Sequence, residues 1–148
     1  MELRHDMLTH GVNIVCAQHQ GRIGGLAVAW ATQLSTDRIL ICVGKQSSTR
    51  ELILNSKAFG LSVLYRDQID IARLFGTKSS QRVNKFESVK HHTAQTGSPL
   101  LDDCIATFDC KVEAVHDDKD HKLIIGKIVH AQSVKEGPEP LIYREEDY

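Results

Sequence analysis

Short apolar segments, each the length of a single β-strand, follow one another along this chain with polar turns between them. Residues 11–17 and 25–32 are two such segments, and the polar stretch 18–22 between them is typical of the turn of a β-hairpin. The turn residues 35–37 lead into residues 38–43, which are apolar on both faces and therefore predict a strand buried on both sides. A succession of this kind favours antiparallel β-structure.

A second pair of strands is expected nearer the C-terminal end. Residues 106–116 alternate between apolar and polar side chains, which predicts an antiparallel strand with one exposed face. The acidic stretch 116–120 is expected to form a turn, and residues 121–131 to return as the partner strand. Residues 141–143 are expected to form a last short strand.

Two segments are predicted to form short helices. Ser48, followed three residues later by Glu51, is a capping-box pattern at the start of a helix that ends near residues 55–56. A second helix is expected over residues 67–75, with its first residue as the cap. The polar stretch 76–99 is too long for a simple connection, and loops of this length are usually functional or form an interface.

These elements predict the fold class. About seven strands and two short helices make the chain β-rich, and strands adjacent in sequence close most naturally as an antiparallel barrel or sandwich. With 148 residues and no repeat or linker, we expect a single domain over residues 1–148. The formal net charge of −1 provides no basic surface, so no nucleic-acid partner is expected.

The chain carries no sequence signal for export or for a membrane. The first six residues include charges where a signal peptide needs an apolar run, and the apolar stretches are too short to span a bilayer. We therefore expect a soluble, cytoplasmic protein. Its four cysteines, Cys16, Cys42, Cys104 and Cys110, form no C-x-x-C pair, and no disulfide is expected. The apolar surroundings of Cys16 and Cys42 are typical of buried structural thiols, with a catalytic thiol as the alternative.

Two polar turns are candidates for a binding site. Residues 32–35 and 46–49 each follow a predicted strand, so both turns lie at one rim if the strands return appropriately. The second turn opens a helix, and the free N–H groups and hydroxyls of a helix N-terminus can hold an anion such as phosphate. The alternative is that Ser47, Ser48 and Thr49 only cap the helix.

The histidines and acids of the chain predict no metal site. His121 follows an acidic turn that contains His116 and three aspartates, but the spacing fits no standard zinc pattern and a solvated hairpin tip explains the acids. His91 and His92 are adjacent, so in an extended segment their side chains point apart. His121 is either a functional residue or an ordinary surface histidine. The G-x-S-x-G, Walker A and H-E-x-x-H motifs are absent.

Three ordered stretches resemble one known family. They are GLAVAWATQLSTD at residues 25–37, VGKQSSTRELI at 43–53 followed by FGLSVL at 59–64, and DHKLIIGKIV at 120–129 with PLIYR at 140–144. In this order they resemble the flavin reductase-like domain family, whose members bind FMN or FAD in a dimeric split barrel. The resemblance covers nearly the whole chain, and it implies an antiparallel split β-barrel of the FMN-binding type.

The resemblance also implies a role for each site residue. His121 takes the position that lies near the nicotinamide in reductases of the family, so it is the implied catalytic residue. Lys85, which precedes Phe86, stands where the family often places a basic residue that can pair with the phosphate. The implied cofactor-binding residues are Trp30, Ala31, Thr32, Gln33, Leu34 and Ser35 along the isoalloxazine ring, and Ser47, Ser48 and Thr49 at the ribityl phosphate.

The activity implied by the resemblance is that of an FMN-dependent NAD(P)H oxidoreductase, with FAD as the other possible flavin and NADH or NADPH as co-substrate. Electrons would pass to free flavin, ferric iron or another small-molecule or protein acceptor, and the flavin would lie at the interface of a homodimer. Arg38 follows Asp37 where the family often has proline, and Ser62 replaces a frequent asparagine. Two alternatives remain: an FMN electron carrier that takes electrons from a protein, as flavoredoxin does, and a flavin-free barrel for binding or assembly.

Overall fold

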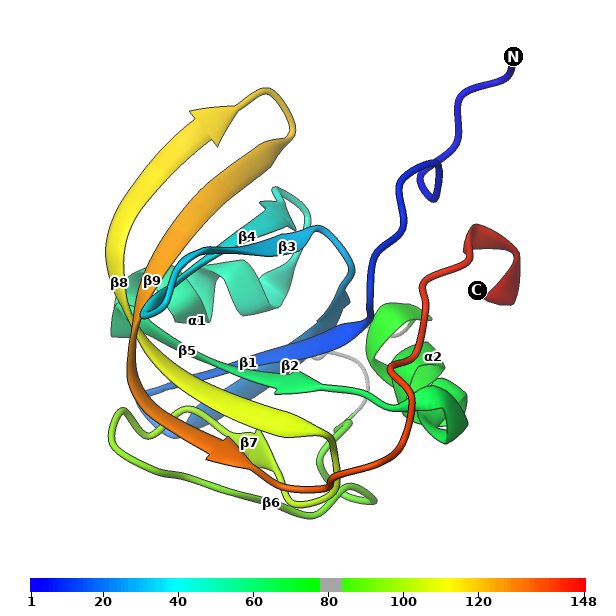
Figure 1. The fold of residues 1–148 in the computed structure, drawn as a ribbon. Helices are drawn as coiled ribbons and strands as arrows, with labels where there is room; N and C mark the ends of the chain where they lie inside the picture. The colour runs from blue at the N-terminus through cyan, green and yellow to red at the C-terminus, as the bar shows by residue number, and fades with distance from the viewer. Residues whose placement is uncertain (78–83) are drawn as a thin grey trace.

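The computed structural model describes residues 1–77 and 84–148, and its main element is one seven-stranded antiparallel sheet (Figure 1). The strands follow one another across the sheet in the order β2-β1-β5-β8-β9-β4-β3. Two helices, α1 and α2, pack against strands of this sheet, and β6 and β7 form a separate pair. The elements are β1 (Asn13–His19), β2 (Arg22–Val28), β3 (Ala31–Ser35), β4 (Arg38–Gly44), α1 (Ser48–Ser56), β5 (Ala58–Val63), α2 (Ile69–Thr77), β6 (His91–His92), β7 (Leu100–Leu101), β8 (Ala106–Asp118) and β9 (His121–Ser133).

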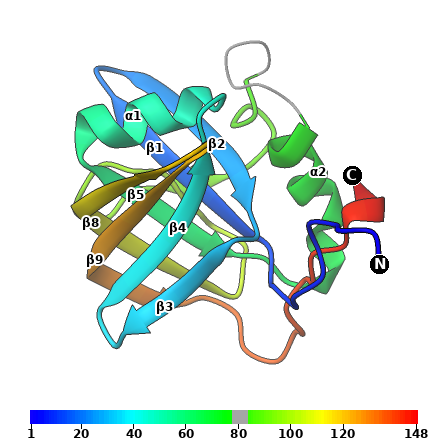
Figure 2. The same ribbon diagram turned by 90° about the horizontal axis from the view of Figure 1, so that it is seen from above.

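The sheet must curl, because its two edges are joined by a very short connection. β2 lies at one edge and β3 at the other, yet only Ala29 and Trp30 separate them in the chain. A flat sheet cannot meet this constraint, since each strand adds about 4.8 Å to its width. The N–H of Cys42 on β4 donates to the carbonyl oxygen of Trp30 at 2.9 Å and extends the β3–β4 ladder by one residue, while β2 contacts β4 where the two ends of the sheet approach each other. The resulting curled sheet, seen in Figure 2, confirms the predicted split β-barrel.

Two apolar cores lie on the two faces of β1. Val15 and Ala17 belong to the core inside the barrel, which Phe59 helps to fill, whereas Ile14 and Cys16 belong to a second core that includes residues of α2. Alternate side chains of a strand point to opposite faces, so β1 is buried on both sides where α2 covers it. β1 and its neighbour β2 therefore separate the interior of the barrel from α2.

The polar turn predicted at residues 32–35 is wrong, because these residues lie within β3. β3 is an edge strand that pairs with β4, and its central residues are exposed to solvent. Polar side chains remain hydrated in such a strand, so the polar composition that indicates a turn is equally compatible with a sheet edge. A register shift between Gln33 and Ser35 bends its end.

The prediction that residues 38–43 are buried on both faces holds for one face only. Ile39, Ile41 and Val43 point into the barrel core, whereas Leu40 and Cys42 are half-buried on the other face. The reason is that the outer face of β4 borders an open pocket, described below, instead of a covering helix.

The predicted capping box at the start of α1 is also wrong. Ser47, not Ser48, is the N-cap, and its side chain makes no capping hydrogen bond. Glu51 pairs with the neighbouring guanidinium of Arg50, at 3.1 Å from Nη2, instead of reaching back to the first turn. The helix ends at Ser56, as the sequence predicts.

Two further segments differ in detail from the prediction. A short 3₁₀ turn at Arg66–Gln68 precedes α2, and residues 141–143 contribute an isolated bridge between Gly11 and Ile142 instead of a strand. Part of the polar stretch 76–99 lies outside the described residues. Its described end is anchored by the fully buried Asp109, which accepts hydrogen bonds from the backbone N–H groups of residues 95 and 96 at 2.8 and 2.9 Å.

No helix in the described part of the chain is long and apolar enough to cross a bilayer.

Candidate functional site

Two adjoining cavities run along β2 and form the candidate site. The first, called here the tryptophan pocket, has a volume of about 240 Å³ and is lined by His5, Trp30, Cys42, His121 and Tyr143 among others. The second, the lysine pocket, has a volume of about 280 Å³ and is lined by residues 46–49 at the start of α1, by Phe75 and Gly76 of α2, and by Lys85. Leu26 and Ala27 of β2 line both cavities, so the two form one continuous site.

Lys85 gives the lysine pocket a buried positive charge. Its side chain is only 3% exposed, and Nζ donates to the carbonyl oxygens of Gly25 at 2.9 Å and Phe75 at 3.1 Å. Burial lowers the pKa of this ammonium to about 8, so it is still mostly charged at neutral pH. The two bonds leave the third N–H of the ammonium for a further acceptor.

The N-terminus of α1 faces the same cavity. Ser47, Ser48 and Thr49 line it, and the N-cap side chain makes no capping hydrogen bond that would satisfy the first turn. An uncapped helix N-terminus presents free N–H groups and partial positive charge. The first turn of α1 and the Lys85 ammonium together make the lysine pocket suited to a phosphate group. This arrangement favours the hypothesis that residues 47–49 bind an anion over the hypothesis that they only cap the helix.

Close packing against Gly25 shapes the wall between β2 and α2. A Cβ atom at this position would lie 2.7 Å from the ring of Phe75, so a larger residue would push α2 away from the strand. Phe75 and Gly25 are also the two residues whose carbonyl oxygens hold Lys85. The position of the buried ammonium therefore depends on this helix–strand contact.

Aromatic rings dominate the tryptophan pocket. The centroid of the Trp30 indole lies 5.5 Å from that of the His121 imidazole, with their planes at 47°. The two residues meet across β4. Trp30 leads into β3 and is hydrogen-bonded to Cys42 on one side of β4, and on the other side β9 starts at His121, which lies opposite Gly44. Such a pocket can hold a flat heteroaromatic ring against an aromatic wall.

The thiol in this pocket is not activated. Burial, and secondarily the nearby Asp118 carboxylate, raises the pKa of Cys42, so the thiolate is disfavoured at neutral pH. Burial is also the main cause that raises the pKa of Cys104 to about 11 and of Cys110 to about 12. All four cysteines are free thiols, as the sequence predicts, and none shows the lowered pKa of a catalytic nucleophile.

The structure brings some of the predicted site residues together and separates others. Ser47, Ser48, Thr49 and Lys85 share the lysine pocket, and Trp30 and His121 share the tryptophan pocket. The rest of the predicted ring-binding segment lies elsewhere: Ala31, Thr32 and Gln33 line a third cavity of about 170 Å³, Leu34 is 42% exposed, and Ser35 donates to Asp37 at 3.0 Å. Their roles therefore remain predictions.

Sequence reasoning missed several residues of the site. His5 lies near the start of the chain without a motif, and Tyr143 belongs to the PLIYR stretch but was assigned no role; both reach the tryptophan pocket only through the tertiary fold. Within residues 1–77 and 84–148, no three His, Cys, Asp or Glu side chains converge in a way that could hold a metal ion. The acidic turn predicted at residues 116–120 is shorter in the structure, because β8 continues to Asp118; Asp117 lies in this strand and pairs with Lys122 of β9 at 2.5 Å.

Comparisons with known proteins identify the family to which the chain is similar. The model of the Flavin reductase like domain matches residues 3–148. The FMN reductase (NADH) RutF 2 of Rhizobium rhizogenes is 30% identical over 139 residues, which are 93% of this chain and 79% of that protein. A ferric-chelate reductase (NAD(P)H) of Archaeoglobus fulgidus is 30% identical over 133 residues, 87% of this chain and 79% of that protein.

Solved structures show the same fold. An FMN-binding protein from Thermus thermophilus superposes with a TM-score of 0.90 at 22% identity, covering 100% of this chain and 89% of that one. Flavoredoxin from Methanosarcina acetivorans gives a TM-score of 0.87 at 18% identity, covering 99% of this chain and 87% of that one. With a family match over nearly its whole length and a curled seven-stranded sheet of the same type, the chain belongs to the flavin reductase-like domain family.

Proposed function

We propose that this chain binds FMN and uses it as an NAD(P)H-dependent flavin or ferric reductase. The observation that carries the proposal is the continuous site along β2, which has an anion-binding end and an aromatic end. FMN has the matching shape, with a phosphate at one end and a flat ring system at the other. The reductases of Rhizobium rhizogenes and Archaeoglobus fulgidus, each 30% identical to this chain, support the activity.

The residues of the lysine pocket fit the phosphate. Its charge would be met by Lys85 and by the first turn of α1, and the hydroxyls of Ser47, Ser48 and Thr49 are further donors. The ribityl chain would lie along Leu26 and Ala27, the two residues common to both pockets. FAD would place its phosphate in the same pocket, so the proposal for this end holds for either flavin.

The residues of the tryptophan pocket fit the ring. When bound, the flavin supplies the hydride-accepting chemistry, so the chain needs no acid–base pair of its own. Trp30 contributes an aromatic wall, and His121 stands at the mouth, where it would orient the nicotinamide of the reductant. The protein's task is to hold the two rings in a reactive pose, within about 3.5 Å of each other.

The proposed function is tested by two measurements on the purified chain. We expect the protein to bind added FMN and acquire the visible flavin spectrum, and anaerobic NADH or NADPH to bleach it. A chain that ignores FMN is a flavin-free barrel, which contradicts the proposal. A chain that binds FMN but is bleached by neither nucleotide is an electron carrier, and the reductase activity is then wrong.

The phosphate end predicts the effect of two substitutions. Ser48→Ala and Thr49→Ala should each weaken FMN binding about 10- to 100-fold, because a charge-assisted hydrogen bond to phosphate is worth about 1.5–3 kcal/mol. Fluorescence titration measures the affinity. Riboflavin, which lacks the phosphate, is the matched control ligand and should bind both variants as it binds the wild type.

A pH titration gives a second signature of the same end. The Lys85 ammonium, whose pKa burial lowers to about 8, loses its proton in the free chain as the pH rises through that value. A bound phosphate favours the charged form, so FMN affinity should fall as the pH rises through about 8 while riboflavin affinity stays level. If both ligands respond alike, the phosphate does not lie beside Lys85.

His121 is predicted to act on reduction and not on flavin binding. His121→Ala should slow anaerobic reduction by NAD(P)H roughly 10- to 100-fold, since a misplaced reactant costs rates of this size, while FMN affinity stays near that of the wild type. His116→Ala is the matched control, because His116 is an exposed histidine on the same hairpin and lies outside both pockets. An unaltered rate in His121→Ala makes His121 an ordinary surface residue.

We also propose that two copies of the chain pair with the flavin near their interface. The third cavity is an apolar groove in which Val63, Phe108 and Ile128 are only partly buried, and it lies against the edge strand β3 with its exposed Leu34. A partner covering this groove would bury these side chains. Light scattering of the FMN-loaded chain is expected to show a dimer, and a monomer that holds FMN contradicts this part of the proposal.

A further inference from the structure

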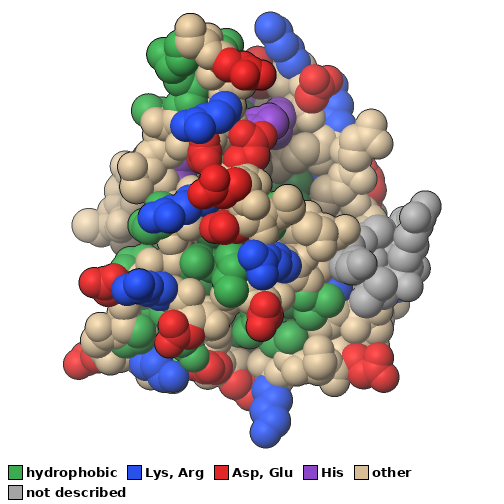
Figure 3. Space-filling view, turned by 90° about the vertical axis from the view of Figure 1, so that its right-hand side faces the viewer, with side chains coloured by type: hydrophobic (Ala, Val, Ile, Leu, Met, Phe, Trp, Pro, Cys, Tyr) green, Lys and Arg blue, Asp and Glu red, His purple; other side chains and the backbone are tan. Residues whose placement is uncertain are grey.

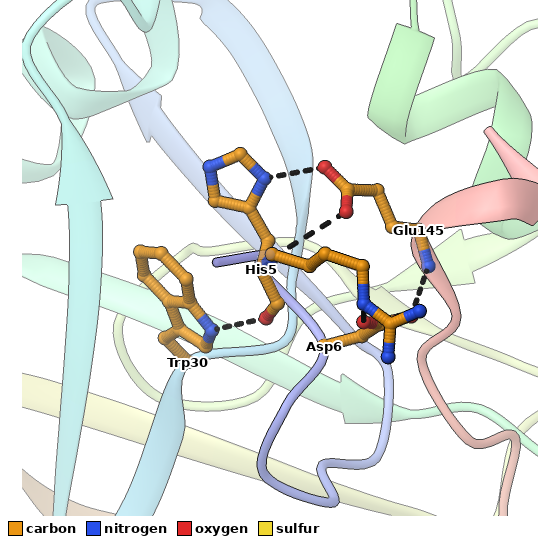
Figure 4. Close-up of polar contacts among 5 residues, drawn as sticks. His5, Asp6, Trp30 and Glu145 are labelled. Atoms are coloured by element: carbon orange, nitrogen blue, oxygen red, sulfur yellow. Dashed lines mark hydrogen bonds and ion pairs between the residues drawn. The ribbon is translucent and has the colours of Figure 1, made fainter. Parts of the chain in front are cut away.

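The segment that precedes β1 reaches the tryptophan pocket, where His5 is one of the lining residues. Figure 4 shows His5 directly beside Trp30, with the indole Nε1 donating to the His5 carbonyl oxygen at 3.3 Å. The His5 ring lies 5.7 Å from the indole, on which His121 also packs at 5.5 Å. His5, Trp30 and His121 therefore form a row of three aromatic rings, of which His5 alone comes from outside the barrel.

The C-terminal turn holds this segment in place. His5 Nδ1 lies 2.7 Å from Glu145 Oε1, and the backbone N–H of Glu145 donates to Asp6 at 3.0 Å. Asp6 in turn pairs with Arg4 at 3.3 Å. We call residues 4–6 the strap and the His5–Glu145 pair its latch. Figure 3, which views the side of the two chain ends, shows acidic, basic and histidine side chains together in its upper part.

The two chain ends run side by side up to the latch. Backbone hydrogen bonds join Val12 to Leu141 at 2.9 Å and Tyr143 to His10 at 2.8 Å, and Val12 is fully packed in the core. Beyond these bonds several side chains at both chain ends are exposed to solvent. The His5 and Glu145 side chains are 65% and 40% exposed, and Leu3 and Leu8 on either side of the strap are exposed as well.

The strap is thus attached to a rigid base by contacts that are easily broken. The His5–Glu145 latch is exposed, and exposed polar pairs contribute little to stability, whereas Asp6, only 15% exposed, keeps its bond to the Glu145 backbone N–H. The strap also buries no large apolar side chain that would have to leave a core. Opening the latch therefore costs little. The paired backbones at residues 10–12 mark the point beyond which the segment can move without disturbing the barrel.

The size of the pocket indicates why opening matters. With the strap in place the tryptophan pocket measures about 240 Å³, below the roughly 300–1,000 Å³ of typical sites for drug-sized ligands. A reductase of the proposed kind must stack a nicotinamide on a flavin, so two ring systems need access at this place. His5, the outermost of the three rings, lies where the second ring would enter.

We propose that His5 is a substrate-contacting residue, which covers the nicotinamide of the bound reductant, and that Glu145 is its positioning residue. The strap opens to admit NAD(P)H and closes over it when the latch forms. This inference rests on the proposed reductase function. It makes the affinity for the nicotinamide nucleotide depend on two residues, one near each end of the chain, of which His5 lines the tryptophan pocket and Glu145 lines neither pocket.

The first test needs neither flavin nor activity. Trp30 is the single tryptophan of the chain, so the fluorescence of the ligand-free protein reports on the strap alone. His5→Ala and Glu145→Gln should raise the acrylamide quenching constant of Trp30, because each releases the cover of the indole. The matched controls are His130→Ala on β9 and Glu146→Gln beside the latch, both exposed residues outside the pocket, which should leave the constant unchanged.

The second test uses the FMN-loaded protein. An aromatic contact is worth a factor of about two to ten in affinity, so His5→Ala should raise the KM for NAD(P)H by that factor. Glu145→Gln, at a residue that lines neither pocket, should raise it less and should leave FMN affinity and kcat within about twofold of the wild type. A merely structural role for the strap would move stability or FMN affinity instead of this KM.

The outcomes separate the strap from the proposed function. Unchanged quenching in His5→Ala overturns the strap as a cover of Trp30. Raised quenching with an unchanged KM overturns the contact with the nicotinamide, while the wild type still counts as a reductase. A wild-type flavin that neither NADH nor NADPH reduces overturns the reductase function itself, and the nicotinamide role of His5 with it.

Discussion

The two-residue link between β2 and β3 is the constraint on which the rest of this structure depends. Because Ala29 and Trp30 alone connect opposite edges of a seven-stranded sheet, the sheet must curl until those edges meet. β2 then contacts β4 at the seam between the two ends of the sheet. The tryptophan pocket lies at this seam, so the pocket forms only when the sheet curls and the barrel closes.

The two ends of the site are built by different physical means. The lysine pocket depends on buried charge: Lys85 is held by two backbone carbonyls against the contact of α2 with β2, and the first turn of α1 faces the same space. The tryptophan pocket depends on ring packing at the mouth of the barrel, and it is open to solvent except where the strap crosses it. A rigid anchor for a phosphate and an adjustable cover for a ring suit a cofactor that stays bound while its substrates exchange.

Rigid and movable parts are also separated along the chain. The residues that line the lysine pocket come from elements whose apolar sides belong to the two cores, whereas the His5–Glu145 latch between the two chain ends is exposed. Loss of the latch should therefore alter access to the site without loosening the fold. This separation makes the proposals for flavin binding and for nicotinamide access testable independently.

Periodicity in the sequence was sufficient to predict the hairpin at residues 106–131 and the end of α1, since alternation and a helical stripe are local patterns. The polar composition at residues 46–49 indicated either an anion site or a helix cap, and the anion site there stays a prediction. β3 was missed because an exposed edge strand and a polar turn have the same composition.

Only the tertiary structure decided three features of the site: the absence of capping at α1, the buried environment of Lys85, and the contacts of His5 with Trp30 and Glu145. Each depends on contacts between residues far apart in the chain, which the curl of the sheet brings together and no local pattern encodes.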